Sequence, residues 1–335
     1  MYESMLKLLQ DPHSREALTL QVREQNGDEI LEGELLCDSS GEKYPIIRGI
    51  PRFVSAENYA ENFGFEWNLF AELQTDRLQN HNLTHERFFE EIGIKPEDLA
   101  GKRVLEAGCG GGRFSDVVLE AGAEVYAFDL SNAVDKNQEI HKGNRNLNLV
   151  QASIDGVPFA HGAFDLVFCF GVLQHTPNPA GFFQELVPFV KPGGTLTVDV
   201  YAAHPKQLLH WKYALRPVTK RMKDEQLLRL VERAAHAFVP ISRQVRRIPR
   251  IGKALSRLIP IFVHDGFMGK VPKADEERWA ILETFDALSP AYDRPRSRRA
   301  VQRWFERAGF TDIETFNLNN ALNYGRGRCP SNVGS

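Results

Sequence analysis

Apolar strand-like segments alternate with helix-like segments between residues 102 and 201, and this alternation constrains the fold more than any other feature. The expected strands are KRVLEAGC, AEVYAFDL, LNLVQAS, FDLVFCFGVL and TLTVDVY, and the expected helices are RFSDVVLEAG, NAVDKNQEIHKG and GFFQELVPFV, which ends at KPGG. Nearly continuous apolar strands joined by helices are typical of a parallel sheet that is covered on both faces. The sequence therefore predicts a doubly wound, mostly parallel α/β sheet. A later amphipathic helix, SRRAVQRWFERAGF, and a last strand, TDIETFNL, should complete it.

A glycine-rich turn, VLEAGCGGGRFS at residues 104–115, follows the first of these strands. At this place in a doubly wound sheet, glycines let a ligand approach the backbone, and the next helix offers free N–H groups. A Walker phosphate loop would need Gly-Lys-Ser/Thr where this chain has Gly112, Arg113 and Phe114. A dinucleotide fingerprint that begins at Gly108 would need a glycine in place of Arg113, so NAD is disfavoured as the ligand.

Two carboxylates accompany the turn. Glu106 stands two residues before Gly108, and Asp129 ends the next strand. A carboxylate beside the loop would repel a pyrophosphate, but it suits a ligand that carries an ammonium group. Asp129 lies where an acid commonly accepts both ribose hydroxyls of an adenosine. The residues thus favour an adenosine with a cationic, phosphate-free tail; the alternative is a tight turn in which Asp129 caps the next helix.

Four ordered segments resemble the class I S-adenosylmethionine (SAM)-dependent methyltransferases. They are VLEAGCGGGRFS, AFDL, QASIDGVPF followed by FDLVFCFGVLQHTPNP, and LVPFVKPGGTLTVDVY. The resemblance covers residues 100–201 and the helix–strand pair near 300–318. It implies a Rossmann-like sheet of seven strands, SAM as the cofactor, and S-adenosylhomocysteine (SAH) as the product.

The resemblance also implies which residues bind the cofactor. Glu106 would anchor the amino group through the loop or a water, Asp129 would take the ribose, and Leu130 would lie on the adenine. The full implied set is Glu106, Gly108, Cys109, Gly110, Arg113, Asp129, Leu130, Ser153, Ile154 and Phe170. Many members of the family have Asp where this chain has Ser153, so Asp155 or a backbone carbonyl would have to serve the adenine amino group.

Candidates for catalysis and acceptor binding lie at the carboxyl edge of the expected sheet and outside the core. His175 follows the fourth strand, and histidine exchanges protons near neutral pH, as a general base must; the alternative is a structural role in its turn. Tyr201 ends the fifth strand, where it could donate a hydrogen bond or pack beneath the neighbouring segment. Trp67, in FGFEW, and Asp286 and Tyr292, in FDALSPAYDRP, are the candidate substrate residues. FGFEW would act as a lid over the cofactor or simply pack in the core.

Five segments are expected along the chain. They are a small β-rich module (1–55), a helical lid or connector (56–100), the SAM-binding core (101–201), a helical basic insertion (202–296), and a final helix and strand with a tail (297–335). The first module resembles a zinc-ribbon-like domain, but Asp11, Ser14, Cys37 and Ser40 occupy the four thiolate positions. Structural zinc needs four good ligands, so no zinc is expected.

The insertion is unusually basic, with fourteen Lys or Arg and three acidic residues between positions 206 and 257. It could be a solvated cap over the sheet, a site for an anionic small molecule, or a surface for a membrane or RNA. Contact with a membrane or with RNA is not favoured.

The net charge of the whole chain is -3, which gives no field that favours DNA. The N-terminus lacks a signal-peptide pattern, and no apolar stretch approaches the roughly 20 residues that span a bilayer. A soluble, cytoplasmic protein is expected.

Together these features predict methyl transfer to a small or medium-sized metabolite, such as a sugar, a lipid-linked compound or a natural-product intermediate. The sequence leaves open whether oxygen, nitrogen or carbon is methylated, and it leaves the oligomeric state open. The alternatives are an RNA methyltransferase and a non-catalytic interaction protein with the same fold.

Overall fold

The computed structural model describes residues 1–54, 61–79, 81–204, 210–263, 273–318 and 321–331. Its centre is a sheet of seven strands in the order β10-β11-β9-β8-β5-β6-β7. Strands β5 to β9 run parallel to one another, whereas β11 is antiparallel to both β9 and β10. The predicted doubly wound, mostly parallel seven-stranded sheet is thereby confirmed. The bounds are β5 Arg103–Ala107, β6 Glu124–Asp129, β7 Leu147–Gln151, β8 Phe164–Cys169, β9 Val190–Tyr201, β10 Thr311–Leu318 and β11 Leu322–Arg328.

Helices cover both faces of this sheet. Successive residues of a strand point to opposite faces, so Val104 and Leu105 of β5 enter two different apolar clusters. The cluster with Leu105 contains Phe183 and Phe305, from α6 and α12, and the cluster with Val104 contains residues of α3, α4 and α5. The bounds are α3 Leu83–Ile92, α4 Arg113–Glu120, α5 Ala133–Ile140, α6 Pro179–Leu186 and α12 Arg298–Arg307. Short 3-10 turns are η1 Glu3–Lys7, η2 Pro96–Leu99, η3 Ile154–Gly156, η4 Leu173–His175 and η5 Val187–Phe189.

Two predicted boundaries in this core are wrong. The KPGG segment does not separate a helix from a strand, because β9 already begins at Val190, and Gly193 N–H donates to the carbonyl of Cys329. The chain after β10 is also more than a tail, since it returns as β11 between β10 and β9. Helix α12 lies so close to β11 that a Cβ on Gly325 would stand 2.6 Å from Phe305 and Val301. Glycine is uncommon in strands, so the glycines of β11 weaken the strand signal in the sequence, yet the packing of α12 requires them.

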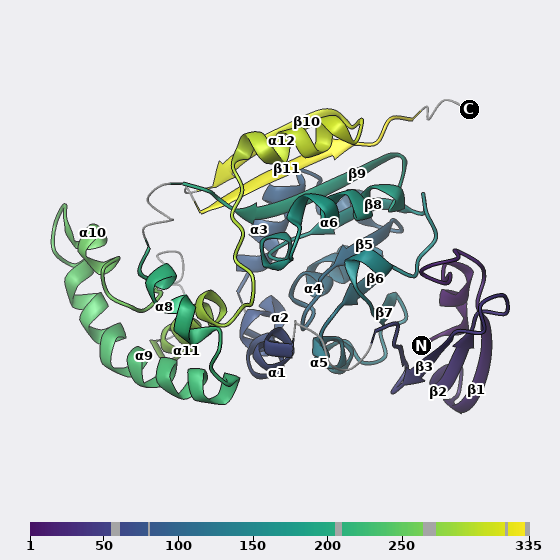
Figure 1. Cartoon of the computed structure of the whole chain (residues 1–335), viewed down its shortest axis with the longest axis horizontal. Helices are drawn as coiled ribbons and strands as arrows, with labels where there is room; N and C mark the ends of the chain where they lie inside the picture. The colour runs from purple at the N-terminus through teal and green to yellow at the C-terminus, as the bar shows by residue number, and fades with distance from the viewer. Residues whose placement is uncertain (55–60, 80, 205–209, 264–272, 319–320, 332–335) are drawn as a thin grey trace.

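The N-terminal module is a four-stranded antiparallel sheet beside the β7 edge of the core (Figure 1). Phe53 N–H donates to the carbonyl of Gln151 on β7, and the guanidinium of Arg15 donates to the carbonyl of Val157. Three of the four positions that the resemblance compares with thiolates lie together: Ser14 Oγ is 3.6 Å from Cys37 Sγ, and Asp11 accepts the N–H of Ser14. Among the described residues, no group of three or more His, Cys, Asp or Glu side chains is arranged to hold a metal. The bounds are β1 Thr19–Asn26, β2 Glu29–Leu36, β3 Lys43–Ile47 and β4 Ile50–Pro51.

The insertion forms a helical lobe at the opposite end of the molecule, and α1 lies between it and the core (Figure 1). Phe70 and Leu73 of α1 pack against Trp279 and Leu282 of α11, which ties the lobe to the connector. No helix in the described part of the chain is both long enough and apolar enough to span a bilayer. The bounds are α1 Glu61–Gln74, α2 Asp76–Gln79, α8 Trp211–Thr219, α9 Asp224–Arg246, α10 Gly252–Ser256 and α11 Lys273–Leu288.

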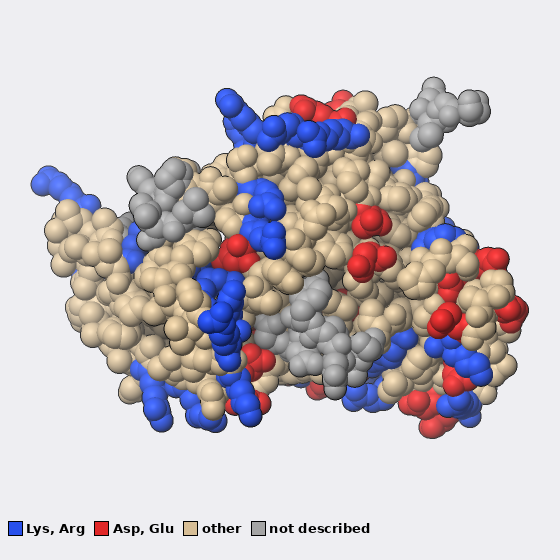
Figure 2. Space-filling model, in the orientation of Figure 1, with Lys and Arg blue, Asp and Glu red and all other residues tan. Residues whose placement is uncertain are grey.

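Some of the insertion's basic side chains hold the lobe together. Lys212 forms an ion pair of 2.7 Å with Asp293, and Arg216 donates to the carbonyls of Ala287 and Pro290. On the face seen in Figure 2, the other blue side chains of this lobe stand in separate groups. The excess of Lys and Arg in the sequence therefore serves partly to tie α8 to the end of α11.

Candidate functional site

A cavity of about 440 Å³ opens at the carboxyl edge of the parallel strands. Residues at the ends of β5 to β9 line one side of it, among them Gly108, Asp129, Phe170 and Tyr201. Residues of α1, α8 and α11 line the other side. The edge of an open parallel sheet where ligands usually bind is thus enclosed by the connector and the insertion.

Neighbouring side chains pack closely against the glycine loop at one side of the cavity. Gly108 and Gly110 have φ angles of +77° and +50°, which side chains other than glycine rarely adopt. A Cβ on Gly108 would lie 2.3 Å from Val172, and one on Gly110 would lie 2.5 Å from the ring of Trp67. Trp67 of α1 therefore packs directly on the loop, while it also lines the cavity.

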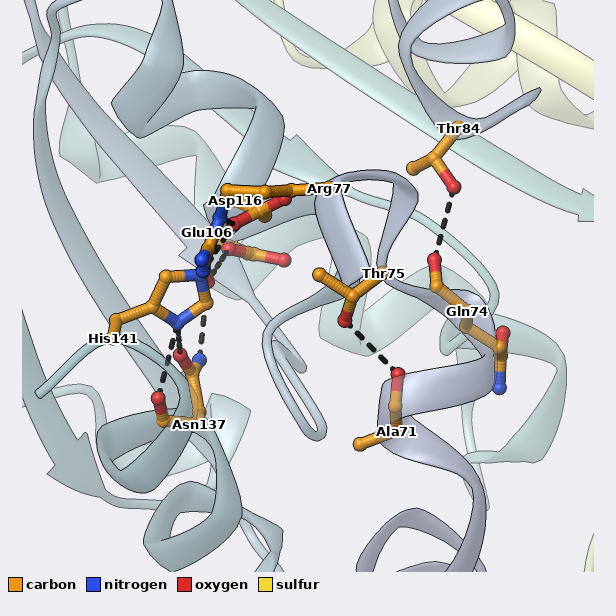
Figure 3. Close-up of polar contacts among 10 residues, drawn as sticks. Ala71, Gln74, Thr75, Arg77, Thr84, Glu106, Asp116, Asn137 and His141 are labelled. Atoms are coloured by element: carbon orange, nitrogen blue, oxygen red, sulfur yellow. Dashed lines mark hydrogen bonds and ion pairs between the residues drawn. The ribbon is translucent and has the colours of Figure 1, made fainter. Parts of the chain in front are cut away.

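A buried polar network supports the loop from behind (Figure 3). Ser115 Oγ donates to Glu106 Oε2 at 2.5 Å and accepts from Asn137 Nδ2 at 3.1 Å. His141 continues the chain, since its Nδ1 lies 2.9 Å from Asn137 Oδ1 and its Nε2 3.0 Å from Asp116 Oδ1. These contacts join β5, α4 and α5, and so they fix the position from which the loop departs.

Glu106 itself lies behind the loop and is only 2 % exposed. Burial raises its pKa to about 8; the hydrogen bond from Ser115 opposes this rise, and the charge of Asp129 adds to it. The side chain does not line the cavity. Any influence on a bound amino group would have to pass through the loop.

A pH-dependent stability is expected from Glu106. Unfolded glutamate loses its proton near pH 4.5, whereas folded Glu106 keeps its proton up to about pH 8. The unfolded state therefore binds fewer protons between these values, and stability falls as pH rises. Between pH 5 and 8, the unfolding free energy of the ligand-free wild type should fall on the order of 4 kcal/mol more than that of Glu106→Gln.

Urea unfolding of both proteins at pH 5, 6.5 and 8 measures this difference. Glu97→Gln, which changes an exposed carboxyl, is the control and should follow the wild type. Parallel pH curves for wild type and Glu106→Gln would contradict the expectation.

Asp129 presents a carboxylate to the cavity from the end of β6. Its Oδ2 accepts the N–H of Gly110 at 2.9 Å, and its Oδ1 accepts the N–H and the hydroxyl of Ser131 at 2.8 and 2.6 Å. Oδ2 therefore has capacity for a further donor, because a carboxylate oxygen offers two lone pairs. Burial raises the pKa of Asp129 despite these hydrogen bonds.

The wall beside Asp129 suits a nucleoside. Leu130, Ile154 and Phe170 supply apolar surface, and Ser153 lies among them. Asp155, the alternative partner for an adenine amino group, is exposed and lies off the cavity wall. The adenosyl part of SAM fits this arrangement, because the carboxylate can accept a ribose hydroxyl and the apolar surface can hold the base.

Two arginines reach the same cavity. Arg87 is held by Glu91 at 2.5 Å and by Asp199 at 2.7 Å. Arg113 donates instead to the neutral groups Thr84 and Gln74, at 3.1 and 3.0 Å. Burial, with the charge of Arg87 added, lowers the pKa of Arg113 to about 10, so it remains a cation at neutral pH.

The structure brings most of the predicted site residues to one cavity. Its wall includes Trp67, Gly108, Arg113, Asp129, Leu130, Ser153, Ile154, Phe170, His175, Tyr201 and Asp286. Glu106, Cys109, Gly110 and Tyr292 do not line it. Glu66, Arg87, Lys212 and Glu283 also line it, although sequence reasoning did not single them out. Of these four, Glu66 lies in a segment that the sequence analysis had considered, FGFEW.

The model of a methyltransferase domain family matches residues 105–198, which run from β5 through most of β9. These residues form a methyltransferase domain. The match agrees with the predicted domain type and with SAM as its methyl donor. The ends of its strands carry the loop, Asp129 and the apolar wall described above.

Curated relatives of this methyltransferase domain include ubiquinone biosynthesis O-methyltransferases. The protein from Psychrobacter arcticus is 31% identical over 145 residues, which are 42% of this chain and 53% of the relative. The protein from Xanthomonas oryzae pv. oryzae is 33% identical over 144 residues, covering 42% and 56%. The chain thus spans about half the length of the curated relatives it matches. Among solved structures, magnesium protoporphyrin IX methyltransferase from Synechocystis PCC 6803, with bound SAH, is 14% identical to this chain, with a TM-score of 0.44 and coverage of 81% of this chain and 96% of that one.

Proposed function

We propose that this chain is a SAM-dependent methyltransferase whose acceptor is a small or medium-sized metabolite. One observation carries the proposal: the same cavity is lined by Asp129 with its apolar neighbours and by Tyr201 with residues of helices α1 and α11. A donor and an acceptor that share one enclosed space can be aligned while water is excluded.

The residues would divide the work as follows. Asp129 would accept a ribose hydroxyl at Oδ2, the wall of Leu130 and Ile154 would hold the adenine, and Arg113 would face the carboxylate of the methionine part. When bound, SAM supplies a methyl group on a sulfonium that is already activated for an in-line displacement. Phe63 and Trp67 of α1 would keep water from this space, because both rings line the cavity.

His175 and Tyr201 would serve the acceptor in different ways. Nδ1 of His175 lies 3.0 Å from the carbonyl oxygen of Tyr292, so this nitrogen is the donor and Nε2 of the neutral ring can accept a proton. Tyr201 donates to Asp286 Oδ2 at 3.0 Å. Burial and the nearby carboxylates raise the pKa of Tyr201 well above its usual value, so its hydroxyl would act as a hydrogen-bond donor.

Replacing His175 should separate the two roles considered for this residue. If Nε2 takes a proton from the acceptor, His175→Asn should lower kcat about 100-fold with a small change in KM, because general base catalysis contributes on this scale. His161→Asn, an exposed histidine away from the cavity, is the control. A raised KM with nearly unchanged kcat would instead assign His175 to positioning the turn at Tyr292.

Transfer of a labelled methyl group tests the proposed function directly. The purified chain would be incubated with methyl-labelled SAM and with the small-molecule, lipid and RNA fractions of a cell extract. We expect label in the small-molecule fraction, formation of SAH, and loss of both with Asp129→Ala. Label in RNA alone would favour the RNA methyltransferase. SAH binding with no transfer to any fraction would favour a non-catalytic protein.

A further inference from the structure

Three carboxyl side chains from two helices line the cavity. Glu66 comes from α1, and Glu283 and Asp286 come from α11. Glu66 stands more than two hundred positions before the other two in the sequence, and the packing of α1 against α11 brings the three to one wall.

Glu66 is the most confined of the three. The residue is 4 % exposed, it lines the cavity, and its Oε2 has no hydrogen-bond partner in the described structure. Leaving a buried carboxyl oxygen unpaired is costly, so such an atom is normally satisfied by a protein group, a water or a ligand. Burial, together with the charges of Asp286 and Asp224, raises the pKa of Glu66 well above its usual value.

Two of the three described Lys and Arg residues that line the cavity are paired with other acids, and the third, Arg113, donates to the neutral groups Thr84 and Gln74. Lys212 pairs with Asp293, and Arg87 pairs with Glu91 and Asp199. Among the described residues, no Lys or Arg forms an ion pair with the three carboxyls of this wall. Burial and Asp286 raise the pKa of Glu283 to about 8, although Arg113 and Arg246 oppose the rise. The wall therefore has an excess of acidic groups.

Asp286 lies apart from the nucleoside side of the cavity. It accepts the hydroxyl of Tyr201 on β9, and β9 is three strands away from β6, which carries Asp129. Three inter-strand steps of 4.7–4.9 Å correspond to roughly 14 Å across the sheet. Asp286 thus stands at the part of the cavity that remains for the acceptor, and its charge acts on both Glu66 and Glu283.

We infer that Glu66, Glu283 and Asp286 bind a protonated amino group of the acceptor, so that the substrates of this chain are amines with an apolar body. The inference rests on the proposed function. A bound ammonium would supply the positive charge that the wall lacks and a donor for Glu66 Oε2. Aromatic side chains of Phe63, Trp279 and Phe262 line the same cavity and would cover the apolar body. The basic composition of residues 206–257 left an anionic acceptor as one of several alternatives, whereas the groups at this wall favour a cationic one.

Three phenols that differ in one group test the inference. Tyramine carries an ammonium, tyrosol a hydroxyl, and 4-hydroxyphenylacetate a carboxylate. Each would be titrated by calorimetry into the wild type saturated with SAH. We expect tyramine to bind at least tenfold more tightly than tyrosol, and 4-hydroxyphenylacetate to bind more weakly than either. Glu66→Gln should weaken tyramine about tenfold and leave tyrosol unchanged.

Glu72→Gln is the matched control, because Glu72 is an exposed carboxyl on the same helix that pairs with Lys136. Tyramine binding no better than tyrosol, or no binding of tyramine, would overturn the inference while leaving the proposed function intact. Weaker SAH binding by Glu66→Gln, with tyramine unaffected, would overturn it as well, since the acids would then serve the ammonium of the cofactor. Failure of SAH to bind the wild type would overturn the proposed function itself, and this inference with it.

Discussion

Asp129→Ala is expected to weaken SAH binding about 10- to 100-fold without unfolding the chain. The carboxylate lies on the cavity wall at the end of β6, between the glycine loop and the apolar slot. Its Oδ2 can accept one ribose hydroxyl; a hydrogen bond to a charged group contributes about 1.5–3 kcal/mol, which corresponds to about 10- to 100-fold in affinity. Calorimetric titration of wild type and variant with SAH measures the loss.

Two further variants isolate the role of this carboxylate. Asp129→Asn keeps the side chain's size and one acceptor oxygen, so its loss should be smaller than that of alanine. Asp155→Ala changes an exposed acid in the neighbouring turn and should bind SAH like the wild type. Equal affinities for wild type and Asp129→Ala would mean that the cofactor's ribose lies elsewhere.

Arg87→Leu is expected to cost about 3–5 kcal/mol of unfolding free energy at pH 7, because it leaves two buried carboxylates without their cation. Arg87 bridges Glu91 on its own helix and Asp199 on β9, and both acids are almost fully buried. Burial already raises the pKa of Glu91 to about 7, against the influence of Arg87. Without the arginine, both acids should hold protons to higher pH, so the loss should shrink at acidic pH.

Urea unfolding at pH 7 and pH 5.5 measures both effects. Arg103→Leu removes an ion pair with Glu124 in which both partners are substantially exposed, and it should cost no more than about 1 kcal/mol. If Arg87→Leu were as mild as this control, or if its cost did not depend on pH, the ion pairs of Arg87 would not hold α3 against the sheet.

The core of the fold was predictable because its signals are local. Each strand from β5 to β8 is a short apolar run followed by a helix, and this order alone indicates a parallel sheet. Strand β11 gives no such signal, because LNYGRGR contains two glycines. Gly325 and Gly327 are required by side chains of α12 and the turn after it, which is a property of the packing rather than of the strand's own sequence.

The two sides of the cavity also differ in how far the sequence alone could predict them. Gly108, Asp129 and Leu130 belong to sequence motifs within 25 positions, so a resemblance could indicate them. Glu66 and Glu283 stand on helices that also carry many apolar residues, and nothing in either helix indicates that the two acids face one space. Their proximity arises only when the connector and the insertion pack over the sheet.

Titration of the wild type with SAH and, separately, with NAD shows which cofactor this cavity binds. SAH should bind with micromolar affinity, because Asp129 and the apolar wall accept its adenosyl part and because SAH has no pyrophosphate that the loop would have to accommodate. NAD should not bind measurably. Binding of NAD in preference to SAH, or binding of neither, would contradict the claim that this cavity is the SAM site.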